Sequence, residues 1–101
     1  MLIPFPIIVF ASQLIMVAAG DIPAFDIPRS CKAEGSTVES VNRCTRDERK
    51  AREQVQTEWS QFGPAAKSTC ARETSIDGTH SYVEFLTCLE MARDAKQLEK
   101  P

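Results

Sequence analysis

The fold is decided by STVESVNRCTRDERKAREQVQTEWSQFGP, residues 36–64. Small or apolar side chains recur there at steps of mostly three and four, the spacing of one helix face: Val38, Val41, Cys44, Ala51, Val55, Trp59 and Phe62. In the capping box Ser36-Thr37-Val38-Glu39, Ser36 is expected to accept a hydrogen bond from the amide of Glu39. Gly63-Pro64 ends the pattern, because glycine suits a helix C-terminus and proline cannot continue a helix. The stretch therefore predicts a helix from Thr37 to Phe62.

Two further helices follow along the chain. Pro64 suits the first position of a helix, and we expect that helix to run from Pro64 to about Glu73. Asp77-Gly78 is a turn dipeptide. After it, Ser81-Tyr82-Val83-Glu84 is a second capping box, and apolar residues continue without a helix breaker to Leu98. The sequence predicts a small all-α domain, in which a hairpin of two helices is joined by a third helix that returns toward Gly63-Pro64.

The N-terminal segment differs from the rest of the chain. Residues 1–20 contain no charged side chain, whereas the 101-residue chain as a whole is 26% charged with a formal net charge of −2. The apolar run ends in small residues, and cleavage after Ala19 or after Gly20 fits the needs of a signal peptidase. We interpret residues 1–20 as a signal peptide that directs the chain to the periplasm or outside the cell.

Other interpretations of residues 1–20 remain open. About 20 apolar residues can span a bilayer, so an uncleaved membrane anchor is an alternative, and a buried core helix is another. Pro4, Pro6 and Ser12-Gln13 disfavour the anchor. No Lys or Arg precedes the apolar run, which departs from the usual signal-peptide pattern.

The segment between the leader and the first helix contains Pro23, Pro28 and Gly35. Because proline and glycine interrupt regular structure, residues 21–35 are expected to form an extended N-terminal arm. Ile22, Phe25 and Ile27 would pack this arm onto the helices of residues 36–101. The whole exported part, roughly 80 residues, is small enough to need covalent support.

Four cysteines offer that support: Cys31, Cys44, Cys70 and Cys88. An even number in a short exported chain indicates disulfides, and the absence of a C-x-x-C spacing disfavours a redox or zinc motif. Three connectivities are possible. The third helix can bring Cys88 near Cys70, and the arm can fold back on the first helix. We therefore favour Cys31–Cys44 with Cys70–Cys88.

Candidate chemical groups are few. His80 is the only histidine, and we interpret it as an exposed turn residue that helps to cap the third helix. Glu48 interrupts the apolar stripe of the first helix. It belongs to a set of carboxylates that we assign to a solvated, salt-bridged face, since nearly all have a basic residue within four positions: Glu34, Glu39, Asp47, Glu48, Glu53 and Glu58. We expect no enzyme, no metal and no cofactor.

The densest basic cluster lies on the first helix: Arg43, Arg46, Arg49, Lys50 and Arg52. Acidic residues alternate with it, and we do not expect nucleic acid as a partner. Contact with an anionic envelope surface or an acidic partner is the alternative. Trp59, Phe62 and Pro64 mark the turn; such aromatic groups can form a binding hot spot, but in so small a domain we assign them to the core.

Two segments carry a family resemblance: WSQFGPAAKSTC, residues 59–70, and SYVEFLTCLEMARDA, residues 81–95. They resemble a group of uncharacterised small exported bacterial proteins with four cysteines. This group shares a Trp-x-x-Phe segment before one cysteine and a segment beginning Ser-Tyr-Val-Glu before another. The resemblance covers roughly residues 29–95 and implies no particular activity.

A second similarity, to LprI-type lysozyme inhibitors, rests on Cys31, Lys32-Ala33, Glu39 and Cys44. It implies a small, exported, helical protein in which Cys31 pairs with Cys44. The function expected from the sequence is a non-catalytic interaction or structural module of the periplasm or envelope, whose partner is a protein or an envelope component. An inhibitor of a cell-wall hydrolase such as lysozyme is one alternative. A membrane-anchored protein that faces the periplasm is the other.

Overall fold

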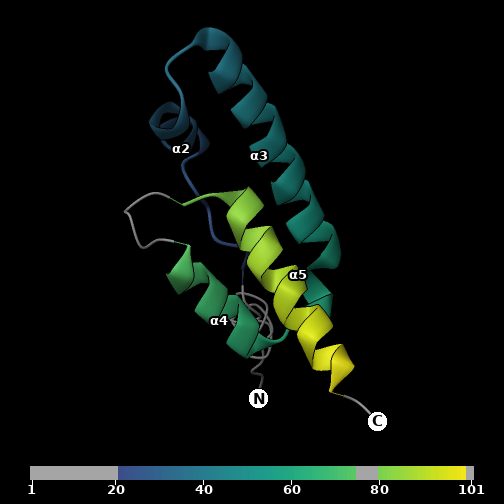
Figure 1. Cartoon of the computed structure of the whole chain (residues 1–101). Helices are drawn as coiled ribbons and strands as arrows, with labels where there is room; N and C mark the ends of the chain where they lie inside the picture. Colours follow the sequence, from purple (N-terminus) through teal and green to yellow (C-terminus); the bar gives the residue numbers. More distant parts are fainter. Residues whose placement is uncertain (1–20, 75–79, 100–101) are drawn as a thin grey trace, which may run out of the picture.

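The structure, a computed structural model, describes residues 21–74 and 80–99. The predicted leader, residues 1–20, and the Asp77-Gly78 turn lie outside the described residues. The described part is all-α, as predicted. It contains α2 (Ile27–Glu34), α3 (Val38–Glu58), the short 3-10 helix η1 (Trp59–Gln61), α4 (Pro64–Glu73) and α5 (Tyr82–Leu98) (Figure 1). No helix in these two ranges is long and apolar enough to cross a membrane.

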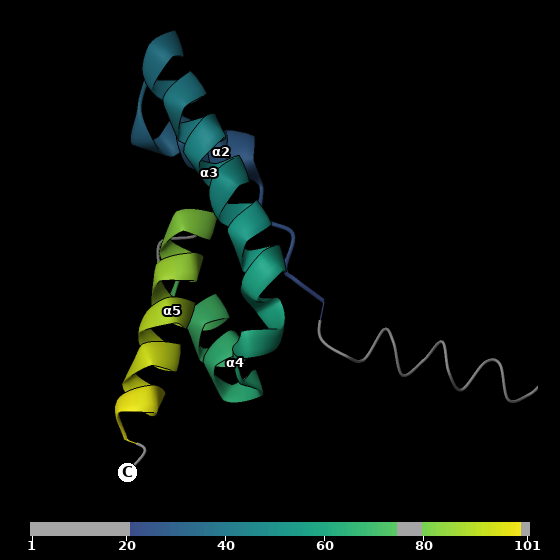
Figure 2. The same ribbon diagram turned by 90° about the vertical axis from the view of Figure 1, so that its right-hand side faces the viewer.

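Helix α5 holds the arrangement together, because it packs against both α3 and α4. Glu48 of α3 contacts the first residues of α5, and Glu58 contacts Arg93 further along, so α3 and α5 run in the same direction. Helix α4 runs the opposite way, as expected for the second arm of a hairpin (Figure 1). The two arms of that hairpin pack on α5 more than on each other. The N-terminal end of α3 extends beyond α5, and α2 packs there (Figure 2).

The predicted extended arm is wrong for residues 27–34, which form α2. Proline is tolerated in the first turn of a helix, because the first amides have no partner within the helix. Pro28 lies in that turn, and the side chain of Asp26 caps it by accepting a hydrogen bond from the Arg29 amide at 3.1 Å. The chain is extended only over residues 21–26. The described part thus contains four α-helices instead of three.

The connection between α2 and α3 is tight at Gly35. A Cβ atom there would collide with the side chain of Ser40. Thr37, and not the predicted Ser36, caps α3 by accepting a hydrogen bond from the Ser40 amide at 3.0 Å. Thr37 is the N-cap because it directly precedes the helix, and the capping oxygen must reach an amide in the first turn.

The α-helical part of α3 ends at Glu58, and not at Phe62 as predicted. The chain tightens into η1 before it turns, and the Phe62 amide donates to the Trp59 carbonyl at 3.2 Å. Such 3-10 turns are common at helix ends. The other two predictions are confirmed: α4 spans Pro64–Glu73, and α5 begins directly after its N-cap, Ser81.

Both favoured disulfides are present. Cys31–Cys44 joins α2 to α3 with a Cα–Cα distance of 5.5 Å, and Cys70–Cys88 joins α4 to α5 with a Cα–Cα distance of 5.7 Å. Cys70 belongs to a small core cluster of buried side chains: Val55, Phe62, Cys70, Phe85 and Leu89. Ile22 and Phe25 of the extended segment pack against this cluster, as predicted, whereas Ile27 begins α2.

Candidate functional site

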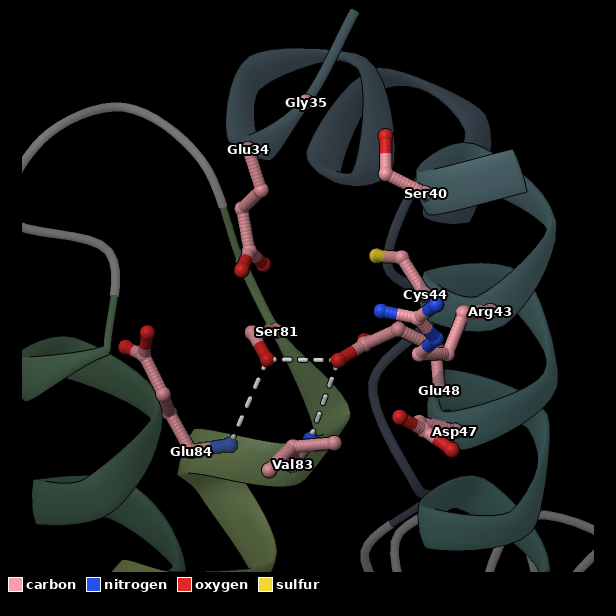
Figure 3. Close-up of a pocket in the computed structure, with 10 residues that line it drawn as sticks. All are labelled: Glu34, Gly35, Ser40, Arg43, Cys44, Asp47, Glu48, Ser81, Val83 and Glu84. Atoms are coloured by element: carbon pink, nitrogen blue, oxygen red, sulfur yellow. Dashed lines mark hydrogen bonds between the residues drawn. The ribbon is translucent and has the colours of Figure 1, made fainter. Parts of the chain in front are cut away.

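Glu48 is the most deeply buried carboxylate of the described residues, with 2% of its surface exposed. It accepts hydrogen bonds from Ser81 Oγ at 2.6 Å and from the Val83 amide at 3.3 Å (Figure 3). It also accepts a hydrogen bond from the Tyr82 amide at 2.6 Å. Ser81 Oγ in turn accepts a hydrogen bond from the Glu84 amide at 3.3 Å. The expectation of a solvated Glu48 is therefore wrong.

The physical reason lies at the start of α5. The first amides of a helix have no partner within it, and the helix dipole places partial positive charge there. Glu48 supplies a carboxylate from a different helix to three donors at this end. The acidic residue that interrupts the apolar stripe of α3 is thus a structural cap for α5. It locks the register of the two helices.

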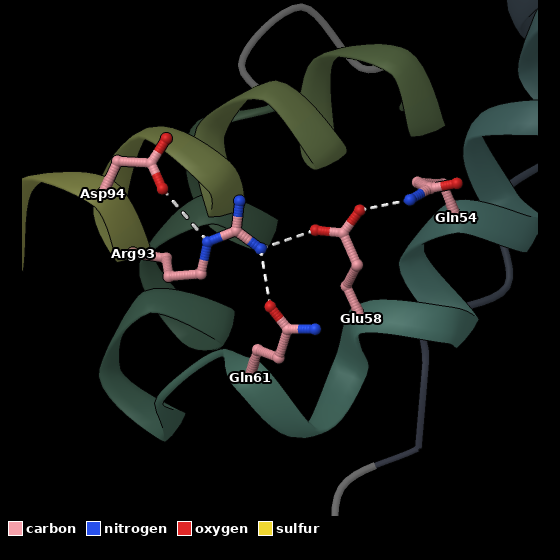
Figure 4. Close-up of polar contacts among 5 residues, drawn as sticks. All are labelled: Gln54, Glu58, Gln61, Arg93 and Asp94. Atoms are coloured by element: carbon pink, nitrogen blue, oxygen red, sulfur yellow. Dashed lines mark hydrogen bonds and ion pairs between the residues drawn. The ribbon is translucent and has the colours of Figure 1, made fainter. Parts of the chain in front are cut away.

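Glu58 is also buried, which corrects its assignment to the solvated face. Its carboxylate accepts hydrogen bonds from Gln54 Nε2 and from Arg93 Nη1, and the second bond is an ion pair of 2.7 Å (Figure 4). Arg93 also contacts Gln61 Oε1 at 2.8 Å and Asp94 Oδ1 at 3.1 Å. This network joins the C-terminal half of α3 to α5.

The pKa values of two neighbouring carboxyl groups in this network, Glu58 and Glu90, are shifted in opposite directions. The hydrogen bond from Gln54 lowers the pKa of Glu58 against the effect of its burial, and Arg93 lowers it further. Burial raises the pKa of Glu90, and the charge of Glu58 raises it further. The pair is a structural element of the α3–α5 interface. Its oxygens are already engaged with side chains of the same chain.

The remaining carboxylates of the predicted solvated face are exposed, as expected: Glu34, Glu39, Asp47 and Glu53. Glu39 pairs with Arg43 at 4.0 Å, one helix turn away. All five members of the basic cluster are exposed on α3 as well. The exposed face of α3 therefore carries acidic and basic side chains next to one another.

His80 differs from its prediction. It is half-buried, and its ring stacks on Phe25 with centroids 4.7 Å apart and planes 21° apart. The capping role assigned to it belongs to Ser81. Phe25 also contacts Tyr82 at a centroid distance of 4.6 Å, so His80 closes an aromatic stack that holds the extended segment.

Of the three turn residues assigned to the core, Trp59 and Phe62 belong to it, as predicted, whereas Pro64 is exposed in the first turn of α4. Phe62 is buried, and Trp59 packs against the core cluster. Lys67 Nζ lies 4.2 Å from the centroid of the Trp59 ring, a cation–π contact between α4 and η1.

The described residues also leave concave surfaces between the helices. A cleft of about 320 Å³ lies between the end of α2, the first half of α3 and the start of α5 (Figure 3). A groove of about 360 Å³ lies between the end of α4 and the outward face of α5. A wider depression of about 860 Å³ follows α4 and the C-terminal half of α5. In the ranges 21–74 and 80–99, no group of three or more His, Cys, Asp or Glu residues is placed to hold a metal ion.

Comparison of the chain with protein-family models, with curated proteins and with solved structures finds no match. Sequence reasoning missed the roles of Glu48 and Glu58. One signal was available for Glu48: an acidic residue inside an otherwise apolar stripe is expected to have a buried partner, because an unpaired buried charge is expensive.

Proposed function

We propose that this chain is a non-catalytic protein-interaction module of an oxidising compartment outside the cytoplasm, periplasmic or secreted. One observation carries the proposal. The buried carboxylates, Glu48 and Glu58, are both engaged in joining α3 to α5. General acid–base catalysis needs a carboxyl oxygen within reach of a substrate, and these oxygens face donors of their own chain.

The display of apolar side chains supports a binding role. Met91 is 66% exposed and Val83 is 41% exposed on the outward face of α5. This helix is fixed by Cys70–Cys88 and by the Glu48 cap, so the face is presented without a large loss of conformational entropy on binding. A rigid scaffold with exposed apolar groups is typical of an interaction surface.

The two disulfides support the compartment. Disulfides persist in oxidising environments and are rare in reducing ones, and small exported domains use them in place of a large core. The core cluster here has few members, which fits that use.

Affinity capture from a cell-envelope fraction tests this function. The bait is the purified chain with both disulfides intact, and the matched control is the same chain after reduction and alkylation. We expect a protein partner that is retained by the oxidised bait and lost from the reduced one. Equal retention by both baits, or a chemical turnover by the purified chain, contradicts the proposal.

Inhibition of a cell-wall hydrolase is the second candidate. The observation that favours it is the Cys31–Cys44 pairing between α2 and α3, which the similarity to LprI-type lysozyme inhibitors implies. A lysozyme turbidity assay separates the candidates. Slower clearing of cell-wall suspension in proportion to the added chain supports inhibition, and unchanged clearing at large molar excess rejects it.

A further inference from the structure

The groove between α4 and α5 is apolar along its length. Val83, Thr87 and Met91 line it from α5, and Cys88 adds the sulfur of the Cys70–Cys88 disulfide. Val83, Thr87 and Met91 follow each other at steps of four, so they lie on one face of the helix, over about 12 Å. Methionine adapts its shape easily, which suits it to binding surfaces. The groove can therefore take an apolar side chain of a partner.

The edge of this groove is acidic. Glu73 lies on the α4 side, where its Oε1 atom is 3.8 Å from Cys88 Sγ, and Glu84 lies on the α5 side. Among the described residues that line the groove, none is a lysine or an arginine. A cationic partner group would meet carboxylates on both sides.

The acidic character continues into the neighbouring cleft at the start of α5. Val83 and Glu84 line both the cleft and the groove, so the two form one continuous surface. The cleft adds the exposed carboxylates of Glu34 and Asp47, and Figure 3 shows the Glu34 side chain directed toward it. Among the described residues that line the cleft, the one basic residue is Arg43, whose guanidinium lies 4.0 Å from the carboxylate of the exposed Glu39.

We propose that this surface, the cleft and the groove that share Val83 and Glu84, binds a partner protein segment with a lysine or arginine next to an apolar side chain. The proposal rests on the proposed function and specifies its partner. The apolar side chain fills the groove between Val83 and Met91. The cation lies near Glu84, with Glu34 and Asp47 around it. Charge complementarity of this kind sets specificity and speeds association.

A peptide titration tests the chemistry of the partner. The purified oxidised full chain is titrated into a fluorescently labelled amphipathic peptide of leucine and lysine, and anisotropy is measured. Two matched peptides replace lysine with glutamate or leucine with serine. We expect the leucine–lysine peptide to bind at least about tenfold more tightly than either matched peptide. Its affinity should fall with added salt.

Variants locate the binding surface. Met91→Asp and Glu84→Lys are each expected to weaken binding about tenfold. The matched controls are Leu98→Asp, at an 86% exposed site near the end of α5, and Glu53→Lys on the exposed side of α3. Both controls should bind as the unchanged chain does. Glu84→Gln keeps the proposal testable if Glu84→Lys fails to fold, and circular dichroism verifies each fold.

Three outcomes overturn the proposal. The first is equal affinity for the leucine–glutamate peptide, and the second is full binding by Met91→Asp and Glu84→Lys. The third is a dimer in analytical ultracentrifugation that Met91→Asp abolishes, which would assign the groove to a second copy of this chain. If a partner captured from the envelope binds all variants equally, the interaction function stands and this surface is wrong.

Discussion

At position 48 a carboxylate occupies a site where the helical stripe of α3 otherwise carries small or apolar side chains. The burial of this group is compatible with a stable fold because three donors at the start of α5 satisfy it. Two of these donors are backbone amides that have no partner within α5. One side chain therefore satisfies the end of one helix and fixes its position against another.

Replacement of Glu48 should destabilise the fold. Glu48→Ala leaves the Tyr82 and Val83 amides without acceptors, and we expect the free energy of unfolding to fall by about 2–4 kcal/mol. Urea denaturation followed by circular dichroism measures this. The matched control is Glu53→Ala on the exposed side of the same helix, which should change stability by less than about 0.5 kcal/mol. Equal effects of the two substitutions would contradict the capping role.

Replacement of Glu58 and replacement of Glu90 should change the pH dependence of the free energy of unfolding in opposite directions. The pKa of Glu90 is raised by burial and by Glu58, so folding favours its protonated form and ionisation weakens the fold as the pH rises above about 4–5. Glu90→Gln should therefore become more stable relative to the unchanged chain as the pH rises above about 4–5. The pKa of Glu58 is lowered by Gln54 and Arg93, so its ionised form supports the fold above this range.

Glu58→Gln should accordingly lose stability relative to the unchanged chain as the pH rises from about 3 to 5, with little further change up to about 7. Urea midpoints across this pH range measure both variants. The other charged groups of the network, Arg93 and Asp94, remain in place in both. Parallel pH profiles for Glu58→Gln and Glu90→Gln would show that the two carboxyls do not act as the structure indicates.

Among the elements, the extended segment 21–26 makes two hydrogen bonds with a single side chain of α5, Tyr82. Tyr82 Oη donates to the Pro23 carbonyl at 2.7 Å and accepts from the Phe25 amide at 2.9 Å. Both contacts join parts of the chain that are far apart in sequence. They hold Phe25 in place beside the core cluster, where its ring stacks on the ring of His80.

Tyr82→Phe removes these two bonds and keeps the ring. We expect a loss of about 1–3 kcal/mol in the free energy of unfolding, because the Phe25 amide loses its acceptor. Hydrogen exchange at the Phe25 amide should accelerate more than exchange in the middle of α3. Unchanged exchange at Phe25 would mean that the aromatic stack alone holds the segment.

The two disulfides should differ in what they stabilise. Each closes a ring of similar size, with sequence separations of 13 and 18, and each should contribute about 3 kcal/mol. Helix α2 packs chiefly on α3, so Cys31→Ser with Cys44→Ser should release α2 and leave the three other helices folded. Cys70→Ser with Cys88→Ser opens the core cluster and should loosen both α4 and α5.

Hydrogen exchange resolved by residue distinguishes these two double variants. Protection should be lost over α2 only in the first variant, and over α4 and α5 in the second. Loss of protection throughout the chain in the first variant would contradict the peripheral role of α2.

The elements differ in how well the sequence predicted them, and the differences have physical causes. α4 and α5 begin with strong local signals, proline at a first position and serine at an N-cap, so their bounds were predictable. The Cys70–Cys88 pairing followed from the placement of these two helices, whereas the Cys31–Cys44 pairing was predicted from an arm that folds back on the first helix. α2 was missed because Pro28 was interpreted as a helix breaker, although proline fits a first turn.

The candidate surface was not predictable from local patterns. Glu34, Asp47 and Glu84 are far apart in sequence, and their shared cleft exists only because α2 and α5 both pack beside α3. The exposure of Met91 likewise depends on which face of α5 meets α3 and α4. Periodicity gives the stripe of a helix, but packing decides which part of the stripe stays open.

At the scale of the whole molecule, the fold leaves one face of α5 open to a partner. α5 is held by α3 along one side, by α4 and a disulfide along another, and by the Glu48 cap at its start. Its remaining face carries Val83, Thr87 and Met91. In the proposed binding mode, this face and the acidic cleft beside the start of α5 receive a basic and apolar segment of a partner protein.

Site-specific photocrosslinking, in living cells of the kind that make the protein, tests whether this face of α5 binds a partner. A benzophenone side chain replaces Thr87 in the groove, and a matched probe replaces Lys50 on the exposed side of α3. Mass spectrometry of the product identifies the partner peptide. We expect an adduct from position 87 and not from position 50, within a partner segment that has a lysine or arginine beside apolar residues. Adducts of equal yield from both positions, or none from position 87, would contradict this binding mode.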